Sequence, residues 1–401
     1  QNTQFSPFLP DYFQQNNQSD LYKIYQKSYK EVFDLKILCN QKKLAHAITN
    51  AQRAINTKTT VEILRGILIS AEDNKLKVRG YDNEISIETE IDAQVELSGS
   101  IVINSKLIGE IVRKLPDSYI SIETDENFNV FISCMSSRFK IKGISAEDFP
   151  NIDNIEAGDM LKISQSDMRN MIRNTVFAAA TDNSNQTFNG ELIEIDREKI
   201  NMAALDGYRL ATMTNPFESG IDKNLSAIVP RNTLNHLNSL LSDEGDLYIA
   251  ISPRDIVFKF DNTRLVGRLI DGEYADYKSL LPKEYVTKIS VETKKLQEAV
   301  ERASLLFTSD KNNTIKMTVT DKLLVITSNN ENGNAYEEIG VEFEGDMLDI
   351  AFNSRYFLDG IKYLNSEYVS IEFLGAINPC VIKPIDDIEY TYLILPVRIS
   401  N

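Results

Sequence analysis

The sequence has no tryptophan, only two histidines and only three cysteines, Cys39, Cys134 and Cys380, which lie far apart. His46 and His236 are too few for a histidine-based metal site. The cysteines form neither a CxxC motif nor the even-numbered set typical of a disulfide framework. We therefore expect no metal, no other cofactor and three buried, reduced thiols.

Long apolar runs and nucleotide-binding signatures are also missing. No stretch approaches the roughly 20 apolar residues that span a bilayer, and no secretory signal opens the chain. The motifs GxxxxGK, GxGxxG after a strand, HExxH and GxSxG do not occur. The sequence thus predicts a soluble cytoplasmic protein with no membrane partner and no enzymatic activity. A phosphotransferase that uses Asp206 and Arg209 is the enzymatic alternative, and no motif supports it.

What the sequence does contain is one unit repeated three times. Strand-like openings place Lys36, Lys162 and Lys288 at equal intervals of 126 residues. Each opening leads into a segment with apolar residues at helical spacing, and a second such segment recurs in the middle of each unit. The expected helices are 41–56, 104–115, 164–180, 230–241, 293–306 and 353–364.

Strict alternation of polar and apolar residues marks the remaining segments, for example 85–91 and 119–123. This period predicts half-buried antiparallel strands. The expected fold is α+β, with three repeated domains that each pack two helices on antiparallel sheets. We predict an N-terminal extension and three domains, joined by linkers at 146–159 and 271–282: 1–33, 34–155, 156–284 and 285–401.

The charge is unevenly distributed along the chain. A net charge of −16 argues at first against a nucleic-acid partner, because affinity for DNA comes mostly from cations that neutralise phosphates. Yet every expected helix has more basic than acidic residues, and helix 41–56 has Lys42, Lys43 and Arg53 with no acid. If the helices line one concave surface, that surface is basic inside an acidic exterior and holds a polyanion loosely. Independent solvated helix faces are the alternative interpretation.

The segment 201–213 reads as a hairpin with a turn at Asp206-Gly207. It carries Leu205, Tyr208, Arg209 and Leu210. An arginine between apolar groups suits a groove that binds a peptide, in which the guanidinium orients a backbone carbonyl or a carboxylate. An ordinary hairpin with a solvated Arg209 is the other interpretation.

Several motifs occur in an order that, with the threefold repeat, resembles the bacterial DNA sliding clamps, the β subunits of the replicative DNA polymerase. The resemblance covers about residues 34–401. Its motifs are KTTVEIL at 58–64, FNG at 188–190, LDGYRLA at 205–211, VPR at 229–231, DGEYADY at 271–277 and LPVRI at 395–399.

The resemblance implies a head-to-tail ring homodimer whose helices line the hole and whose sheets form the outside. Such a ring is a processivity factor: it encircles double-stranded DNA without reading its sequence and catalyses nothing, exonuclease cleavage included. It tethers the DNA polymerase III catalytic subunit, the clamp loader and repair proteins through short motifs that carry Gln and Leu or Phe. A three-repeat peptide-binding scaffold unrelated to DNA remains a third interpretation.

The resemblance also implies three kinds of site. The peptide groove, between the second and third domains, would use Phe188, Leu205, Gly207, Tyr208, Arg209, Leu210, Leu280, Asn353, Tyr356, Leu393, Leu395, Pro396, Val397 and Arg398. The DNA contacts would be Lys58, Lys106, Arg113 and Arg231. The dimer interface would pair Phe139 of one subunit with Leu305 and Leu306 of the other.

Some positions depart from the family pattern. Leu205 stands where Thr is frequent, Tyr208 where His is, Ala275 where Pro is and Ser279 where a basic residue is, so the preferred peptide is open. Asn232 stands where a lysine is common, which weakens one DNA contact.

The N-terminal extension is the main addition to the family pattern. Its segment Gln4-Phe5-Ser6-Pro7-Phe8 resembles the pentapeptide Gln-Leu-Ser/Asp-Leu-Phe that partners insert into the groove. We therefore expect either an extension that competes for the groove or a tail without that role.

Overall fold

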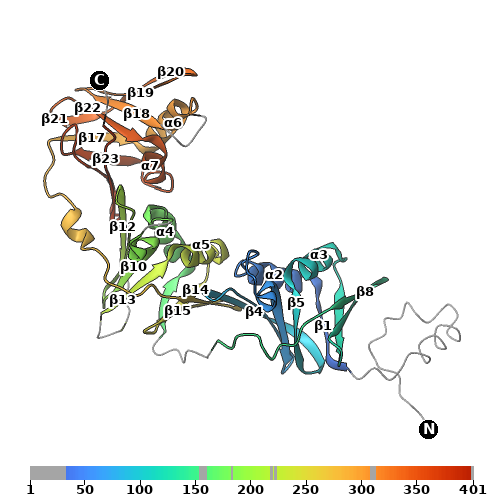
Figure 1. Ribbon diagram of the computed structural model, residues 1–401. Helices are drawn as coiled ribbons and strands as arrows, with labels where there is room; N and C mark the ends of the chain where they lie inside the picture. The colour runs from blue at the N-terminus through green and yellow to red at the C-terminus, as the bar shows by residue number, and fades with distance from the viewer. Residues whose placement is uncertain are drawn as a thin grey trace, which may run out of the picture. The chain divides into compact units, whose positions relative to one another are not determined.

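The computed structural model describes residues 33–152, 160–181, 184–216, 220, 224–307 and 313–398. The groove-mimic hypothesis for Gln4–Phe8 falls outside the described residues, as do residues 153–159 of the first expected linker. The three-repeat α+β architecture predicted from the sequence is present (Figure 1).

The first repeat begins at the predicted opening strand. Its elements are β1 (Phe33–Asn40), α2 (Gln41–Gln52), the 3-10 helix η2 (Glu62–Arg65), β2 (Gly66–Glu72), β3 (Lys75–Tyr81), β4 (Ile85–Leu97), β5 (Gly99–Asn104), α3 (Ser105–Lys114), β6 (Tyr119–Asp125), β7 (Asn129–Cys134) and β8 (Ser137–Lys142).

The second repeat follows the same order. Its elements are β9 (Leu161–Ser164), α4 (Gln165–Thr175), η3 (Val176–Ala178), η4 (Gln186–Asn189), β10 (Gly190–Ile195), β11 (Lys199–Leu205), β12 (Arg209–Pro216), β13 (Leu225–Pro230), α5 (Arg231–Leu240), β14 (Asp246–Ile251), β15 (Asp255–Phe260) and β16 (Thr263–Arg268).

The third repeat is preceded by η5 (Tyr277–Leu280). Its elements are β17 (Thr287–Glu292), α6 (Thr293–Ser304), β18 (Thr314–Val319), β19 (Leu323–Asn330), β20 (Gly333–Gly340), β21 (Glu342–Gly345), β22 (Leu348–Asn353), α7 (Ser354–Asp359), β23 (Tyr368–Phe373), β24 (Cys380–Pro384) and β25 (Tyr390–Ile394).

The six expected helices are all present, and capping accounts for the starts of three of them. The side chains of Asn104, Ser164 and Asn353 each accept a hydrogen bond from a backbone N–H in the first turn of α3, α4 and α7. Helix α7 is shorter than the expected 353–364. It ends before Gly360, where any β-carbon would lie 2.2 Å from the Tyr392 ring, so the close packing on β25 requires a glycine at this position.

The contacts divide the chain into two compact units. The first comprises residues up to 48, 61–78 and 90–149, and the second comprises 49–60, 79–89 and 150 onward. This division cuts through the first repeat and does not follow the expected domain limits, which stay predictions.

In the first unit the strand order is β8-β7-β6-β1-β4, with β2 pairing β3 and β5. Strand β6 has the predicted alternation: Ile120 and Ile122 are buried between exposed or half-buried neighbours. Helix α3 contributes Ile108, Ile111 and Val112 to the core.

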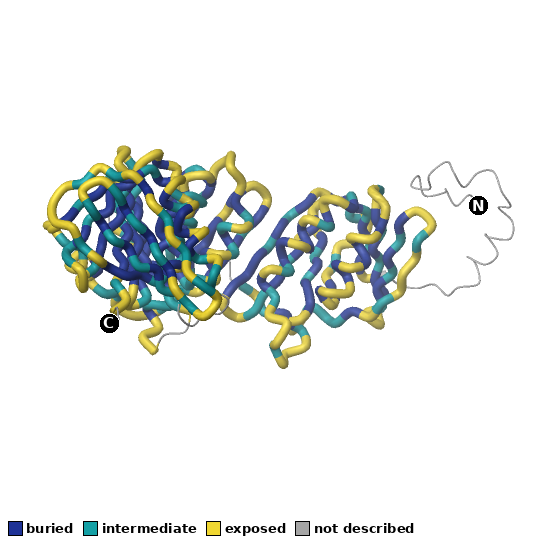
Figure 2. The backbone as a smooth tube through the Cα atoms, turned by 90° about the horizontal axis from the view of Figure 1, so that it is seen from above, coloured by how far each residue is buried: buried dark blue, intermediate teal, exposed yellow. Residues whose placement is uncertain are grey.

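In the second unit, residues 85–89 of β4 pair with β16, which begins the order β16-β15-β14-β9. A second sheet has the order β13-β10-β11-β12-β25-β24-β23-β17-β21, and a third has the order β20-β19-β18-β22. Helices α4 and α5 pack together, and α4 also packs against β11 and β12 (Figure 1). One apolar core runs through the second and third repeats, and the buried stretches of the chain are dark blue in Figure 2.

The three cysteines are free and buried, as predicted. Burial raises the pKa of the Cys39 thiol to about 12, which keeps it protonated and unreactive at neutral pH. None of the helices in the described ranges is both long and apolar enough to cross a membrane. Across the same ranges, no cluster of three or more His, Cys, Asp or Glu side chains is arranged to hold a metal ion.

Candidate functional site

The hairpin predicted around Asp206-Gly207 is formed by β11 and β12. The Asp206 carboxylate accepts hydrogen bonds from the backbone N–H groups of Tyr208, at 2.9 Å, and Arg209, at 3.1 Å. Gly207 has φ of 92°, the left-handed conformation that favours glycine. The turn therefore presents Gly207 and Tyr208 to solvent.

The third repeat lies directly beside this hairpin. Strand β25 pairs with β12 from Arg209 opposite Ile394 to Met213 opposite Tyr390. Beyond β25, the N–H of Leu395 donates to the carbonyl of Tyr208 at 2.9 Å. The structure thus brings together two motifs, LDGYRLA and LPVRI, that are nearly 200 residues apart in the sequence.

Three expected wall leucines are buried and do not line an open surface. Leu205, Leu210 and Leu393 belong to an apolar cluster with Ala203 and Val381 on the sheet β10-β11-β12-β25-β24. Half-buried Phe188 packs against the same cluster. We call this apolar cluster the floor. The segment that follows β16 packs against it.

That covering segment, residues 271–281, was expected to be a linker. Instead it is attached to the sheet by two tyrosines. The hydroxyl of Tyr274 accepts from the N–H of Leu205 at 3.2 Å, and the hydroxyl of Tyr277 donates to Glu194 at 2.7 Å and accepts from the side-chain amide of Asn201. We call residues 271–281 the strap. The two tyrosines three residues apart were the available sequence signal for this attachment.

A cavity of about 920 Å³ lies along the strap, over β10 and β13. Leu192 and Ile228 of the apolar cluster line it, together with Arg254 and Arg268. None of the expected groove residues lines this cavity.

We call four exposed apolar residues that lie close in sequence to members of this floor cluster the rim. Tyr208 is 63% exposed, Leu280 of the strap 53%, and Leu395 and Val397 38% each. Pro396 is half-buried and Arg398 is exposed. A row of exposed apolar side chains above a buried apolar floor is the arrangement typical of a peptide-binding surface.

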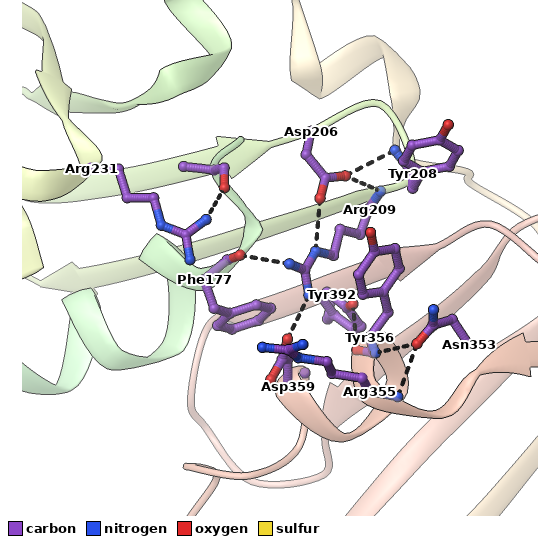
Figure 3. A network of polar contacts seen from close by, with 12 residues as sticks. Phe177, Asp206, Tyr208, Arg209, Arg231, Asn353, Arg355, Tyr356, Asp359 and Tyr392 are labelled. Atoms are coloured by element: carbon purple, nitrogen blue, oxygen red, sulfur yellow. Dashed lines mark hydrogen bonds and ion pairs between the residues drawn. The ribbon is translucent and has the colours of Figure 1, made fainter. Parts of the chain in front are cut away.

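The structure differs from the expectation that Arg209 is solvated or reaches toward a ligand. Its side chain is only 8% exposed (Figure 3). Nε donates to Asp206 at 3.0 Å, Nη1 to Asp359 of α7 at 2.7 Å, and Nη2 to the carbonyl of Phe177 at 2.8 Å. The guanidinium also lies 4.1 Å from the centre of the Tyr356 ring. Arg209 is therefore occupied by groups of the protein itself.

Two other expected groove residues also have partners within the chain. Asn353 caps α7, because its side-chain carbonyl accepts from the N–H groups of Arg355 and Tyr356. The Tyr356 carbonyl accepts from the hydroxyl of Tyr392 at 2.7 Å. The Tyr356 ring stands 6.4 Å from the exposed Tyr208 ring, with the two planes tilted by 39°.

The expected DNA contacts divide into two groups. Lys58, Lys106 and Arg113 are exposed. Arg231 is half-buried, and its guanidinium donates to the Ala179 carbonyl (Figure 3). Burial and the neighbouring Arg209 lower the pKa of Arg231. Arg231 thus has a partner within the protein, and its contact with a DNA phosphate stays a prediction.

The expected interface residues are exposed. Phe139 on β8 is 40% exposed, Leu305 at the end of α6 is 78% exposed, and Leu306 is half-buried. Strand β8 ends its strand order, and so does β20.

Sequence reasoning missed Glu191 on β10. The side chain is fully buried on the helix side of the sheet, and neither carboxylate oxygen has a hydrogen-bond partner in the described structure. The hydroxyl of nearby Thr175 donates to the Met171 carbonyl instead. Burial raises the pKa of Glu191 to about 8, against the attraction of Arg231. A glutamate beside the FNG motif gave no sign of this burial.

Three family matches cover the described chain. Residues 35–153 match the N-terminal domain of the DNA polymerase III beta subunit, residues 162–276 its central domain and residues 278–398 its C-terminal domain.

Individual proteins are similar over the same length. The beta sliding clamp of Bacillus subtilis is 31% identical over 376 residues, which is 91% of this chain and 100% of the relative. The crystal structure of the DNA polymerase sliding clamp from Bacillus subtilis superposes with a TM-score of 0.88, at 31% identity over 92% of this chain and all of the other. The DNA polymerase III subunit beta from Pseudomonas aeruginosa superposes with a TM-score of 0.85, at 25% identity over 91% and 100%.

Proposed function

We propose, on the premise that this chain belongs to the family of beta sliding clamps of DNA polymerase III, that two copies close a ring around duplex DNA and hold partner proteins by short peptides. The relatives are named as clamps, and the chain is accordingly a clamp and not an enzyme. The phosphotransferase alternative has no remaining support, because Asp206 and Arg209 bind each other.

The peptide site would be the rim of Tyr208, Leu280, Leu395 and Val397 above the floor of Leu205, Leu210 and Leu393. The observation that carries this proposal is the contact between the hairpin and the C-terminal segment, where Leu395 bonds to Tyr208. Leu and Phe side chains of a partner motif would bury apolar area on the rim, which is the main source of affinity for such motifs.

Fluorescence anisotropy with a labelled Gln-Leu-Ser-Leu-Phe peptide tests this site. We expect Leu395→Asp to weaken binding at least about tenfold, because a charge in an apolar contact is costly to desolvate. Met347→Asp is the matched control, since Met347 is 63% exposed in the same repeat and precedes β22 at the end away from Asn353 and α7. Equal effects of the two substitutions would place the peptide elsewhere.

Ring closure is supported by the equivalence of strands among the repeats. Strands β8, β16 and β25 occupy corresponding places, since β16 begins 126 residues after β8 and β25 begins 127 after β16. Strands β4, β12 and β20 also correspond, since they begin at 85, 209 and 333. Within the chain, β16 pairs with β4 and β25 pairs with β12. The members left over are β8 and β20, each at the end of its strand order.

We therefore infer that β8 of one protomer pairs with β20 of the other, which closes a head-to-tail dimer through two identical junctions. The charges of the two edges are complementary. The sequence of β8, SRFKIK, has three basic residues and no acid, whereas that of β20, GNAYEEIG, has two acids and no base. Phe139 and Leu305 would be buried in this junction.

Native mass spectrometry tests the junction by charge reversal. Arg138→Glu with Lys140→Glu is expected to yield monomers, and Glu337→Lys with Glu338→Lys is expected to do the same. A mixture of the two variants makes both junctions of a heterodimer complementary and should therefore form heterodimers. A failure of the mixture to associate would contradict the strand assignment.

Topological DNA binding is tested with nicked circular DNA. A closed ring remains on the circle and is lost after linearisation, whereas a peptide scaffold unrelated to DNA is retained on neither. We expect charge reversal of Lys58, Lys106 and Arg113 together to reduce retention, because DNA affinity comes from cations near the phosphates. Arg231→Gln alone should have a smaller effect, because that side chain is bound to Ala179.

A further inference from the structure

Arg209 joins two repeats through several contacts at once. On the side of the second repeat it bonds to Asp206 in its own turn and to the Phe177 carbonyl. On the side of the third repeat it bonds to Asp359 of α7 and stacks on Tyr356 of the same helix. Figure 3 shows these polar contacts between the hairpin and α7. The same two repeats are also joined by the backbone pairing of β12 with β25.

Little of the guanidinium is left for a ligand. Its three nitrogen atoms each already donate within the chain, and the side chain is 8% exposed. The ring centre of Tyr356 lies 4.1 Å from the guanidinium carbon and that of Phe177 lies 5.4 Å from it. Contacts of this kind fix the orientation of the aromatic ring as well as that of the arginine.

Tyr356 connects this buried group to the rim. Its ring touches Arg209 and also lies 6.4 Å from the ring of Tyr208, which is 63% exposed. Its backbone is held by Asn353 and Tyr392, so the helix position and the ring position are set by different groups. Loss of the Arg209 contact would therefore release the ring while α7 stays anchored.

We propose that Arg209 is a positioning residue for the peptide groove: it does not touch the bound peptide, but with Asp359 it locks the second repeat to the third and holds the Tyr356 ring against Tyr208. This Arg209–Asp359 latch deepens the peptide-binding function proposed above and rests on it. The latch assigns a role in binding to Asp359, which lies outside the set of groove residues expected from the sequence. It also makes the two aromatic rings a preformed wall for an apolar or aromatic side chain of the partner.

The decisive variant is Asp359→Asn, which removes the charge on the third repeat and leaves Arg209 in place. We expect it to lower the affinity for a Gln-Leu-Ser-Leu-Phe peptide by about fivefold to tenfold, within the range for losing one charge-assisted hydrogen bond. Arg209→Met should weaken it at least as much. Asp359→Glu keeps the carboxylate and should recover most of the affinity. Asp349→Asn is the matched control, because Asp349 pairs with Lys316 in the same repeat without contacting the rim.

Two forms of the peptide separate a latch from a ligand contact. If the latch holds, Asp359→Asn lowers the affinity for the peptide equally whether the C-terminus of the peptide is a free carboxylate or an amide. An arginine that binds the peptide carboxylate affects only the free acid, and Asp359→Asn would then leave the affinity of the amide unchanged. That result, or wild-type affinity in Asp359→Asn with both peptides, would overturn the proposal.

Hydrogen exchange without any peptide provides an independent measurement. The latch predicts faster exchange in Asp359→Asn at 205–210 and at 395–398, where the N–H of Leu395 bonds to Tyr208, and unchanged exchange in Asp349→Asn. If wild-type protein fails to bind the peptide while exchange responds as predicted, the groove assignment is wrong and the latch stands. If the peptide binds and exchange is unchanged, the latch is wrong.

Discussion

Two strand junctions in the second compact unit have the same turn and different chemistry. At the first junction, β4 pairs with β16, and at the second, β12 pairs with β25. The hairpin turns that precede β4 and β12 have the same pattern of hydrogen bonds. Asp82 accepts from the N–H groups of residues 84 and 85 as Asp206 does from those of 208 and 209. Asn83 and Gly207 both have positive φ, at 78° and 92°.

The two junctions differ in the two residues that come directly after the shared turn. The first turn continues with Glu84 and Ile85, and the second with Tyr208 and Arg209. At the first junction the polar groups satisfy one another: buried Thr89 and Thr263 share a hydrogen bond of 3.1 Å, and Arg79 bonds to Glu88. At the second, Arg209 is buried and Tyr208 is left exposed beside Leu395.

The comparison shows that a repeated backbone does not produce a repeated site. Both junctions hold strands together by the same ladder of hydrogen bonds, but only the second leaves apolar area uncovered. A binding surface therefore depends on the side chains at two turn positions and on the strap that partly covers the floor.

The largest expected effect at the two junctions is on stability and comes from Arg209→Met. The substitution leaves the carboxylates of Asp206 and Asp359 without their shared partner, and we expect a loss of about 2–3 kcal/mol, given that Asp359 is partly exposed. Arg79→Met at the first junction should cost about 1 kcal/mol, because Glu88 still faces Arg264 across the β4–β16 pair. Urea denaturation followed by circular dichroism measures both, and a larger loss for Arg79→Met would contradict the contrast.

A second prediction concerns the pH dependence of stability and contrasts Glu191 with Glu194 on the same strand. Burial raises the pKa of Glu191 to about 8, so the folded protein keeps a proton that the unfolded chain releases above its ordinary pKa near 4.5. Stability should fall as the pH rises between these values, by up to about 1.4 kcal/mol per pH unit, and then level off. Glu191→Gln should remove this slope.

The melting temperature of Glu191→Gln relative to wild type, measured from pH 5 to 9, checks this slope. Glu194→Gln on the same strand is the control. Burial alone would raise the pKa of Glu194, but Tyr277 and Lys278 outweigh it and lower that pKa below its ordinary value of 4.5. Glu194 therefore stays charged throughout this pH range, and Glu194→Gln should differ from wild type by a constant amount. A constant difference between Glu191→Gln and wild type would contradict a buried neutral acid.

Exchanging the turn residues tests the comparison directly. Tyr208→Glu places the residue of the first turn into the second, and we expect about tenfold weaker peptide binding with little change in stability, since Tyr208 is mostly exposed. The reciprocal Glu84→Tyr should not create a second peptide site, because the place of Leu395 is taken at the first junction by the charged Arg268, whose N–H donates to the Glu84 carbonyl at 2.8 Å. Anisotropy titrations with stoichiometry measure both, and a second bound peptide in Glu84→Tyr would show that the turn alone is sufficient.

The first junction yields a smaller effect. Thr263→Val removes the hydroxyl that bonds to Thr89, and we expect a loss of about 1 kcal/mol. The double variant Thr89→Val with Thr263→Val should cost less than the sum of the two single substitutions, although Thr89→Val also removes the acceptor of the Asn50 side-chain amide at 3.3 Å. Fully additive losses in urea denaturation would mean that the pair contributes nothing as a pair.

The smallest expected effect concerns the N-terminal extension. If Gln4–Phe8 competes for the rim, deletion of residues 1–33 should tighten peptide binding by a few-fold, as the local competitor is removed. Phe5→Ala with Phe8→Ala in the full chain should have the same effect as the deletion. Identical affinity in all three proteins would exclude competition.

Much of the fold was predictable because it depends on local periodicity. The spacing of Leu44, Ala47, Ile48 and Ala51 predicted the apolar face of α2, and all four are buried. The repeat of 126 residues predicted equivalent elements, and the Asp206-Gly207 pair predicted the hairpin. Helix ends were less accurate: α7 ends at Asp359, before the close contact of Gly360 with the distant Tyr392 ring.

The sequence by itself determined the repeat, the hairpin, the absence of cofactor motifs and the family, since each is encoded in residue order and spacing. Only the tertiary structure decided what the individual side chains do. The same arginine reads as solvated, ligand-binding or buried until Asp359 and Tyr356, 150 residues away, are brought beside it. Glu191 likewise reads as an ordinary strand glutamate until the sheet and helices exclude water from it. Burial and charge pairing depend on distances between remote segments, and no local pattern contains those distances.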